Sequence, residues 1–279
     1  MCIRDSYMSI FKRLKGKTKG DIINWVESEL STSCIRPFKT LYVNFRCLPL
    51  KQAIRFPIVI RRKFSIHCLG EIKIESDEIC RGMICFGSFN NKSSRPTRIV
   101  NRGTIIFRGS CTIWEGVLLE LGPKSLLDIG DSSLLGENVN IMIRKGCKIG
   151  DYARIAFDSQ IMDSDFHYML DMETNEIKDC TQPIIIGNCN WIGNRSTIKK
   201  GTITPDYTIV ASNSLLSKSY VMGGGKYPIL AGCPAKVIGS GKRRIYNYEW
   251  EKILYNHFKD NKEPYHYKDN GINPFLIPK

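Results

Sequence analysis

His167 ends the short sequence MDSDFH (residues 162–167), in which two aspartates precede the imidazole. An imidazole changes its protonation state near neutral pH, and a carboxylate bonded to one ring nitrogen fixes the tautomer and raises the basicity of the other. We therefore predict that His167 is a general base, with Asp165 or Asp163 as its orienting partner. The remaining histidines are expected to be structural or surface residues: His67, His257 and His266.

The segment expected to position this histidine runs from Pro183 to Lys218 and repeats every six residues. The residues in this six-step series are Ile186, Ile192, Ile198, Thr204, Val210 and Leu216. Four of the six are followed by a small residue. A period of six fits neither an α-helix nor a plain strand, but it is typical of a parallel β-helix. We predict that these side chains point into the coil and that the small residues relieve crowding where the chain turns.

A looser form of the repeat begins near residue 65, and its phase slips by two residues between Ile141 and Ile143. We attribute this slip to an insertion at a corner of the coil. Residues 163–182 form the largest break, and long loops in compact domains are more often functional than not. The predicted fold is therefore all-β, a parallel β-helix over residues 65–240 with a catalytic loop at 163–182.

Both ends of the chain depart from the repeat. Residues 8–64 are predicted to be a basic capping segment, with a short amphipathic helix from Asp21 and extended pieces between Pro37 and Lys63 that cover the first coil. Residues 241–279 are predicted to hold an amphipathic helix from Tyr246 to Phe258 and an irregular tail. Residues 1–7 read unlike the rest, and we interpret them as an assembly remnant, with Met8 as the true start.

The net charge of +14 is concentrated near the N-terminus, where residues 1–65 hold 14 Lys and Arg against 4 Asp and Glu. No nucleic-acid-binding motif accompanies this charge, so we do not expect a nucleic-acid partner. Residues 9–63 are instead expected to contact an anionic membrane face or a phosphate-bearing acceptor, or to form a solvated basic surface.

No long apolar run or export signal is recognisable, which predicts a cytoplasmic protein, peripheral at the inner membrane face. The 11 cysteines contain no CxxC and are expected to be reduced thiols.

Four stretches together resemble a known family: DSDFH ending at His167, PIIIGNCNWIGN at 183–194, ASNSLLSK at 211–218 and AGCPAKVIG at 231–239. On these motifs the chain, over about residues 100–240, resembles the hexapeptide-repeat acyltransferases, in particular the sugar and polysaccharide O-acetyltransferase branch. Cys233 stands where the family ending G-N-P-A-K has Asn, and Thr204-Pro205 replaces its usual aliphatic–Gly pair. The resemblance implies a left-handed β-helix, acetyl-CoA as co-substrate, and a homotrimer with active sites between subunits.

The same resemblance implies roles for individual residues. The cofactor-binding set runs from the acyl end to the nucleotide end: Trp191, Asn194, Ser212, Ser217, Lys218 and Lys236. Further candidate contacts are Lys199, Lys200, Lys242 and Arg243. The candidate acceptor ligands are Asn138 and Asn140, and no metal is expected. The implied chemistry is direct transfer, in which His167 deprotonates an acceptor hydroxyl as it attacks the thioester. A backbone N–H from the turns at 191–194 or 211–212 would stabilise the oxyanion.

The main prediction is an acetyl-CoA-dependent O-acetyltransferase of surface polysaccharide or glycan biosynthesis, acting on a lipid- or nucleotide-linked sugar. Amino-sugar N-acetylation is the closest alternative. A serine acetyltransferase would carry a long helical N-terminal domain, and a zinc hydratase of this fold would need three histidines on neighbouring coils. A non-enzymatic scaffold would have no need of both the DSDFH and the P-A-K elements.

Overall fold

The computed structural model describes residues 35–87, 93–221 and 225–275. The helix predicted from Asp21 and the interpretation of residues 1–7 lie outside these ranges. The chain divides into two compact units, with Ser31–Lys242 in one and Arg243–Lys279 in the other. We describe each unit by itself.

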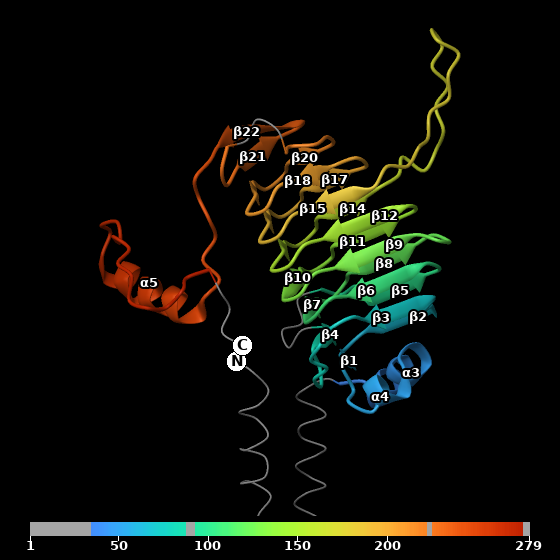
Figure 1. Ribbon diagram of the computed structural model, residues 1–279, viewed down its shortest axis with the longest axis horizontal. Coiled ribbons are helices and arrows are strands. Elements are labelled where there is room, and N and C mark those ends of the chain that lie inside the picture. The colour runs from blue at the N-terminus through green and yellow to red at the C-terminus, as the bar shows by residue number, and fades with distance from the viewer. Residues whose placement is uncertain (1–34, 88–92, 222–224, 276–279) are drawn as a thin grey trace, which may run out of the picture. The chain divides into compact units, whose positions relative to one another are not determined.

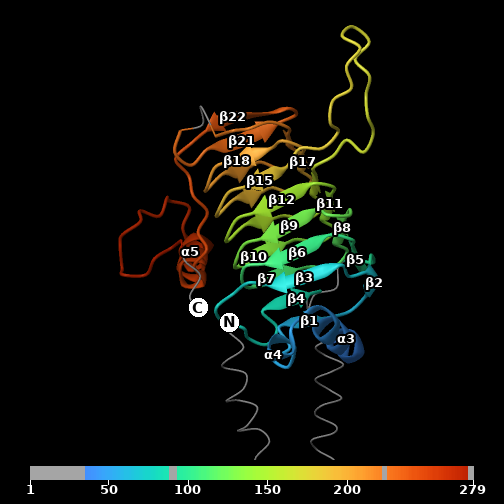
Figure 2. The same ribbon diagram turned by 45° about the vertical axis from the view of Figure 1, so that its right-hand side comes forward.

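The first unit is a coil in which successive strands join three sheets in turn (Figures 1 and 2). Face 1 contains β1 (Ile58–Ile60), β4 (Ile84–Phe86), β7 (Cys111–Ile113), β10 (Ser133–Leu135), β13 (Arg154–Ile155), β16 (Trp191–Ile192), β19 (Ile209–Val210), β21 (Ile229–Gly232) and β22 (Ala235–Gly239). Face 2 contains β2 (Phe64–Cys68), β5 (Thr97–Asn101), β8 (Leu118–Leu121), β11 (Asn140–Ile143), β14 (Gln160–Met162), β17 (Thr197–Lys199) and β20 (Leu215–Leu216). Face 3 contains β3 (Glu71–Ile74), β6 (Thr104–Phe107), β9 (Leu126–Ile129), β12 (Gly146–Ile149), β15 (Ile184–Ile186) and β18 (Ile203–Thr204).

Neighbouring strands within each face pair in parallel, except the final hairpin of β21 and β22. The predicted all-β parallel β-helix is therefore confirmed, although its first coil opens at Ile58, earlier than the predicted boundary at residue 65. We call the connections between the faces corners 1–2, 2–3 and 3–1.

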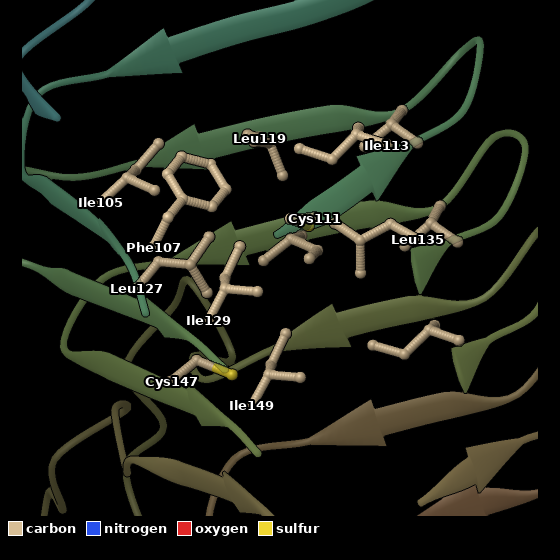
Figure 3. Close-up of a cluster of buried hydrophobic side chains, with 14 of the residues drawn as sticks. Ile105, Phe107, Cys111, Ile113, Leu119, Leu127, Ile129, Leu135, Cys147 and Ile149 are labelled. Carbon is tan, nitrogen blue, oxygen red and sulfur yellow. The ribbon is translucent and has the colours of Figure 1, made fainter. Parts of the chain in front are cut away.

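The six-step residues fill the interior of the coil, as predicted, and all of them are buried: Ile186, Ile192, Ile198, Thr204, Val210 and Leu216. Figure 3 shows the same stacking in earlier coils, where Leu127 and Cys147 belong to successive turns. Thr204 is a polar member of the series, and its hydroxyl donates to Asn190 Oδ1 at 2.7 Å. The phase slip also has its predicted cause: Ile141 and Ile143 are both buried on β11, before the corner at residues 144–145.

Small residues follow the inward side chains because each corner touches the next coil. A Cβ added at Gly130 would lie 2.4 Å from the backbone nitrogen of Asp151, and one at Gly193 would lie 2.6 Å from that of Ser212. The Asp151 carboxylate in turn accepts the N–H of Asp131 at 2.8 Å. Stacked corners thus satisfy each other's backbone groups, which buried amides require.

The basic segment before the coil differs from its prediction. Residues between Pro37 and Lys63, expected to be extended, instead form α3 (Pro37–Cys47) and α4 (Leu50–Ala53) before β1. Proline is compatible with the first turn of a helix, where its missing N–H costs nothing, so Pro37 begins α3 rather than preventing it. Asn44 of α3 donates to the Ile58 carbonyl at 2.7 Å and accepts the Ile58 N–H at 3.1 Å. The helix therefore satisfies the open edge of β1, the first strand.

The second unit contains the predicted C-terminal helix, α5 (Tyr248–Asp260), within two residues of its expected bounds. The Asn247 side chain caps it by accepting the N–H groups of Glu249 and Trp250. Trp250 is 1% exposed and donates its indole N–H to the Ile272 carbonyl at 2.7 Å, which fits a packing role. In the part of the chain that the structure describes, no helix has the length and apolarity needed to cross a membrane.

Candidate functional site

The break at residues 163–182 is a hairpin arm that leaves corner 2–3 between β14 and β15 and projects away from the coil (Figure 1). Two antiparallel bridges join its branches, Ser164 with Thr181 near the base and Leu170 with Ile177 near the tip. The Asp165 N–H donates to the Cys180 carbonyl at 2.9 Å, which closes the base. The arm is therefore an ordered support for His167, which follows the base.

Asp163 anchors this arm to the preceding coil. Its carboxylate is fully buried and accepts three backbone N–H groups, those of Arg144, Lys145 and Gly146, each at 2.7 Å. Asp163 thus holds two corners together, and no hydrogen bond joins it to His167. The prediction that Asp163 orients the imidazole is corrected here, because the carboxylate hydrogen-bonds backbone amides of the preceding coil instead.

Asp165 is paired with two lysines from the next coil. Its carboxylate lies 3.2 Å from Lys199 Nζ and 2.6 Å from Lys200 Nζ. The pKa of Asp165 is lowered, mainly because Lys200 hydrogen-bonds the carboxylate. Among the described residues no hydrogen bond connects Asp165 to His167, so its observed role is to hold the two lysines against the base of the arm.

His167 is exposed and borders a pocket of about 240 Å³ between the arm and corner 2–3. The pocket combines the imidazole with charged and apolar side chains, and its lining includes Lys200, Asp179, Cys180 and Met169. Lys145 Nζ lies 3.1 Å from the Asp179 carboxylate at the pocket edge. A base beside cations in an open pocket can accept a proton from a polar substrate while an anionic group lies near the lysines.

Two further residues lie beside the base of the arm: Arg144, which no sequence motif indicated, and Phe166, which belongs to the DSDFH motif. The Arg144 guanidinium lies over the Phe166 ring, 5.1 Å from its centroid, and forms an ion pair with Glu120 at 2.6 Å. Phe166 has a φ of 64°, an uncommon value for a non-glycine residue that turns the chain immediately before His167. The phase slip at 141–143 was the available signal, since it places Arg144 at the same corner as the arm.

Three of the predicted cofactor residues gather at a different corner. Trp191 is 41% exposed on β16, and Asn194 follows it at corner 1–2. One coil further, Ser212 donates its hydroxyl to Asn194 Oδ1. These three residues thus form one column along the coil, at the opposite end of the face 2 strands from His167.

The same column carries the predicted oxyanion donors, of which only some are free. The N–H groups of Trp191, Gly193 and Ala211 donate to carbonyls of the next coil. This leaves the amides of Asn194 and Ser212 without an acceptor among the described residues. Within one chain these amides and His167 lie at opposite ends of face 2.

The remaining cofactor residues lie elsewhere. Ser217 and Lys218 are exposed at corner 2–3, one coil beyond Lys199 and Lys200, because β20 pairs with β17 in the register Ile198 to Leu216. Lys236 is exposed on β22, opposite Ala231 in the final hairpin. Lys218 therefore extends the basic column beside His167, whereas Lys236 belongs to the end of the coil.

The predicted acceptor ligands also lie away from the arm. Asn138, at corner 1–2, accepts a hydrogen bond from the Ser93 hydroxyl at 2.7 Å and donates to Asp158 at 3.1 Å. Asn140 begins β11 next to Gln160 of β14. Asn138 is thus engaged in linking successive corners, and both asparagines share the corner of Asn194 rather than that of His167.

Residues 35–87, 93–221 and 225–275 contain no group of three His, Cys, Asp or Glu placed to hold a metal ion. His67 contacts Ser65 and Arg98 at 3.4 and 3.3 Å, and His257 contacts the Glu263 carbonyl at 3.0 Å. The described cysteines are free thiols, from buried Cys111 to exposed Cys233.

No protein-family profile matches the chain. A curated relative is the "Putative lipopolysaccharide biosynthesis O-acetyl transferase WbbJ" of Escherichia coli K12, which is 27% identical over 172 residues. The aligned region includes 56% of this chain and 81% of the relative.

Solved structures with a similar fold include the polysialic-acid-specific acetyltransferase NeuO, at 19% identity and a TM-score of 0.44, covering 73% of this chain and 98% of that chain. The N-acyltransferase AntD from Bacillus cereus, in complex with dTDP and 3-hydroxybutyryl-CoA, has 17% identity and a TM-score of 0.38, covering 72% of this chain and 87% of that chain.

Proposed function

We propose that the chain, an acyltransferase that resembles the hexapeptide-repeat family, transfers an acetyl group from acetyl-CoA to a saccharide hydroxyl. Its curated relative and its three-sided coil support this proposal. The observation that carries this proposal is the position of His167 at an open pocket whose wall includes Lys200. The relative's printed name, an O-acetyl transferase of lipopolysaccharide biosynthesis, supports a surface glycan as the class of acceptor.

In the proposed reaction an imidazole nitrogen of His167 takes the proton of the acceptor hydroxyl as its oxygen attacks the thioester carbonyl. The tetrahedral intermediate collapses, the C–S bond breaks, and the CoA thiolate leaves. The column of Lys199, Lys200 and Lys218 supplies positive charge beside the base, which suits the phosphates of CoA. Asp165 keeps the first two of these lysines at the arm.

We propose that the functional unit is a homotrimer with each site formed between two subunits. The free amides of Asn194 and Ser212 suit an oxyanion or the amides of pantetheine, yet they lie at the other corner of face 2 from His167. A neighbouring copy that presents its corner 1–2 to the arm would bring both sets together. Apolar side chains that the arm exposes, including Tyr168, Met169 and Met172, suit such a contact.

The test measures CoA release with wild-type protein, acetyl-CoA and a panel of glycan precursors, followed by mass spectrometry of the product. His167→Ala is expected to lower kcat by about 10²- to 10⁴-fold, the range for loss of a general base. His67→Ala is the matched control, because His67 is an exposed histidine on β2 remote in the fold from the arm. Undiminished turnover in His167→Ala contradicts the proposal, and an N-acetylated product identifies the amino-sugar alternative.

A further inference from the structure

Helix α3 has a second apolar face that the coil does not use. Its inward side buries Thr40, Val43 and Asn44. Its outward side carries four exposed apolar residues at helical spacing: Phe38, Leu41, Tyr42 and Phe45. Residues that are three and four apart lie on one face of a helix, so these side chains form a continuous stripe. Phe38 is 86% exposed, and large apolar side chains that cluster in this way commonly mark an interaction site.

The stripe continues onto the next element. Phe45 packs edge-on against Phe56, which follows α4, with ring centroids 6.0 Å apart. Leu50 and Ile54 of the α4 segment are 69% and 58% exposed. Figures 1 and 2 both show α3 and α4 at the end of the coil opposite β22. The apolar stripe therefore lies at the terminal coil, away from the arm that carries His167.

The segment of the chain that carries the stripe has charge of a single sign. Eight Lys and Arg residues lie between positions 36 and 63, and no Asp or Glu occurs between Glu29 and Glu71. Arg46 and Lys51 are exposed next to the stripe, at the end of α3 and the start of α4. The next acidic residues in the chain are Glu71 and Glu75, which pair with Lys73 and Arg108. Asp77 and Glu78 follow, in the segment whose Ile79 carbonyl accepts a hydrogen bond from Arg55.

We propose that this stripe of α3 and α4, with its basic border, docks the protein on an anionic lipid bilayer. A helix that buries apolar side chains in the headgroup region while lysines and arginines meet anionic lipid is the general form of an interfacial anchor. A second copy of this segment would present the same positive charge and be repelled, whereas an anionic bilayer is complementary to it in both charge and apolar character. The inference does not depend on the acyl-transfer reaction, since vesicle binding is measured without turnover.

The experiment is co-sedimentation of the full chain with vesicles of phosphatidylcholine alone and of phosphatidylcholine with phosphatidylglycerol. Binding is expected only with phosphatidylglycerol and is expected to weaken when salt rises from 0.1 to 1 M, where the Debye length falls from about 10 to about 3 Å. Neutralising two charges in Arg46→Gln/Lys51→Gln should lower the partition coefficient about 30-fold, since each basic residue near an anionic surface contributes about fivefold. Phe38→Ser/Leu41→Ser should lower it at least about tenfold through lost apolar burial.

The control is Tyr255→Ser/Lys259→Gln on α5, which removes one exposed aromatic residue and one exposed charge and should bind as the wild type does. Failure of the wild type to bind anionic vesicles overturns the proposal. Binding at the wild-type level by Arg46→Gln/Lys51→Gln or by Phe38→Ser/Leu41→Ser overturns it as well. A changed oligomeric state of Phe38→Ser/Leu41→Ser in ultracentrifugation would instead make the stripe a subunit interface. A large fall in its thermal midpoint would show that the chain itself covers the stripe, and either result also overturns the proposal.

Discussion

Replacing Asp163 by asparagine tests whether this aspartate anchors the arm or serves the imidazole. The buried carboxylate accepts the N–H groups of Arg144, Lys145 and Gly146, two of them on Oδ2. Asparagine keeps one oxygen, which can still accept two of these N–H groups, but it removes the charge and places an NH₂ group against the third donor. Hydrogen bonds to a charged acceptor contribute about 1.5–3 kcal/mol each, and buried donors left unpaired cost about 1–3 kcal/mol each. We expect Asp163→Asn to lower the free energy of unfolding by about 3–5 kcal/mol.

The matched control is Asp165→Asn, two residues along the same arm. Asp165 is partly exposed and paired with Lys199 and Lys200, and ion pairs of this kind contribute about 0–1 kcal/mol. Chemical denaturation gives the free energy for both variants, and hydrogen exchange at residues 144–146 locates the loss. A solenoid can open locally, so the exchange measurement separates release of the corner from global unfolding.

Two results would refute the anchoring argument. One is a change below about 1 kcal/mol for Asp163→Asn, which would mean that its three hydrogen bonds contribute almost nothing. The other is an Asp163→Asn protein as stable as the wild type that has lost acyl transfer. That outcome would restore the original prediction, in which Asp163 orients His167.

Three further predictions concern the packing of the coil, the reactivity of the thiols and the pH dependence of the arm. Gly130→Ala is expected to destabilise the protein by about 1–3 kcal/mol, because its Cβ would lie 2.4 Å from a backbone nitrogen of the next coil. Gly146→Ala is the control, because the nearest atom to its Cβ would be 3.8 Å away. Equal thermal midpoints for the two variants would contradict the packing argument. In native protein at pH 8, iodoacetamide should modify exposed Cys233 but spare Cys111, since burial raises the pKa of the Cys111 thiol to about 12. Peptide mass spectrometry measures the labelling of each thiol, and rapid labelling of Cys111 would refute this prediction. The pKa of Asp179 is lowered from 3.8 to about 2, chiefly by a hydrogen bond from the Thr181 N–H. The stabilisation that this carboxylate gives the arm is therefore present above pH 3.8 and lost as the pH falls through about 2. An NMR titration of the Asp179 carboxyl with a midpoint at or above 3.8 would contradict this.

The sequence predicted most of the coil because its period is a steric requirement. Ile192 and Ile198 must point inward, and Gly193 must leave room for the next coil. Helix α5 was equally predictable from its spacing of apolar residues. The helices α3 and α4 were not, since Pro49 and Pro57 indicated breaks between extended pieces. In the structure Pro37 occupies the first turn of α3 and Pro49 precedes α4 as its N-cap, and both positions tolerate proline.

The site was predictable in place but not in detail. The arm and His167 lie where the break in the repeat indicated, and strand alternation could have placed Asp163 on the inward side. Ile161 points inward on β14, so Asp163 two residues later also points inward, where it meets backbone amides. The separation of Asn194 and Ser212 from the arm depends on which corner each turn occupies, and a motif read along the chain does not contain that information.

The location of the chemistry follows from how the corners are built. At corners 1–2 and 3–1 a residue with positive φ recurs in successive coils, as at Asp158 and Tyr152, and its N–H donates to a carbonyl of the preceding coil. From residue 108 onward these interlocked turns keep three or four residues at each such corner. Corner 2–3 lacks this interlock at residues 144–145, and in the next coil it holds the whole arm from 163 to 182. Because strands of successive coils are about 4.8 Å apart, side chains at corner 2–3 of one coil lie close to those at corner 2–3 of the next. The imidazole of His167 and the ammonium-bearing side chain of Lys200 therefore line one pocket at the corner that holds the arm.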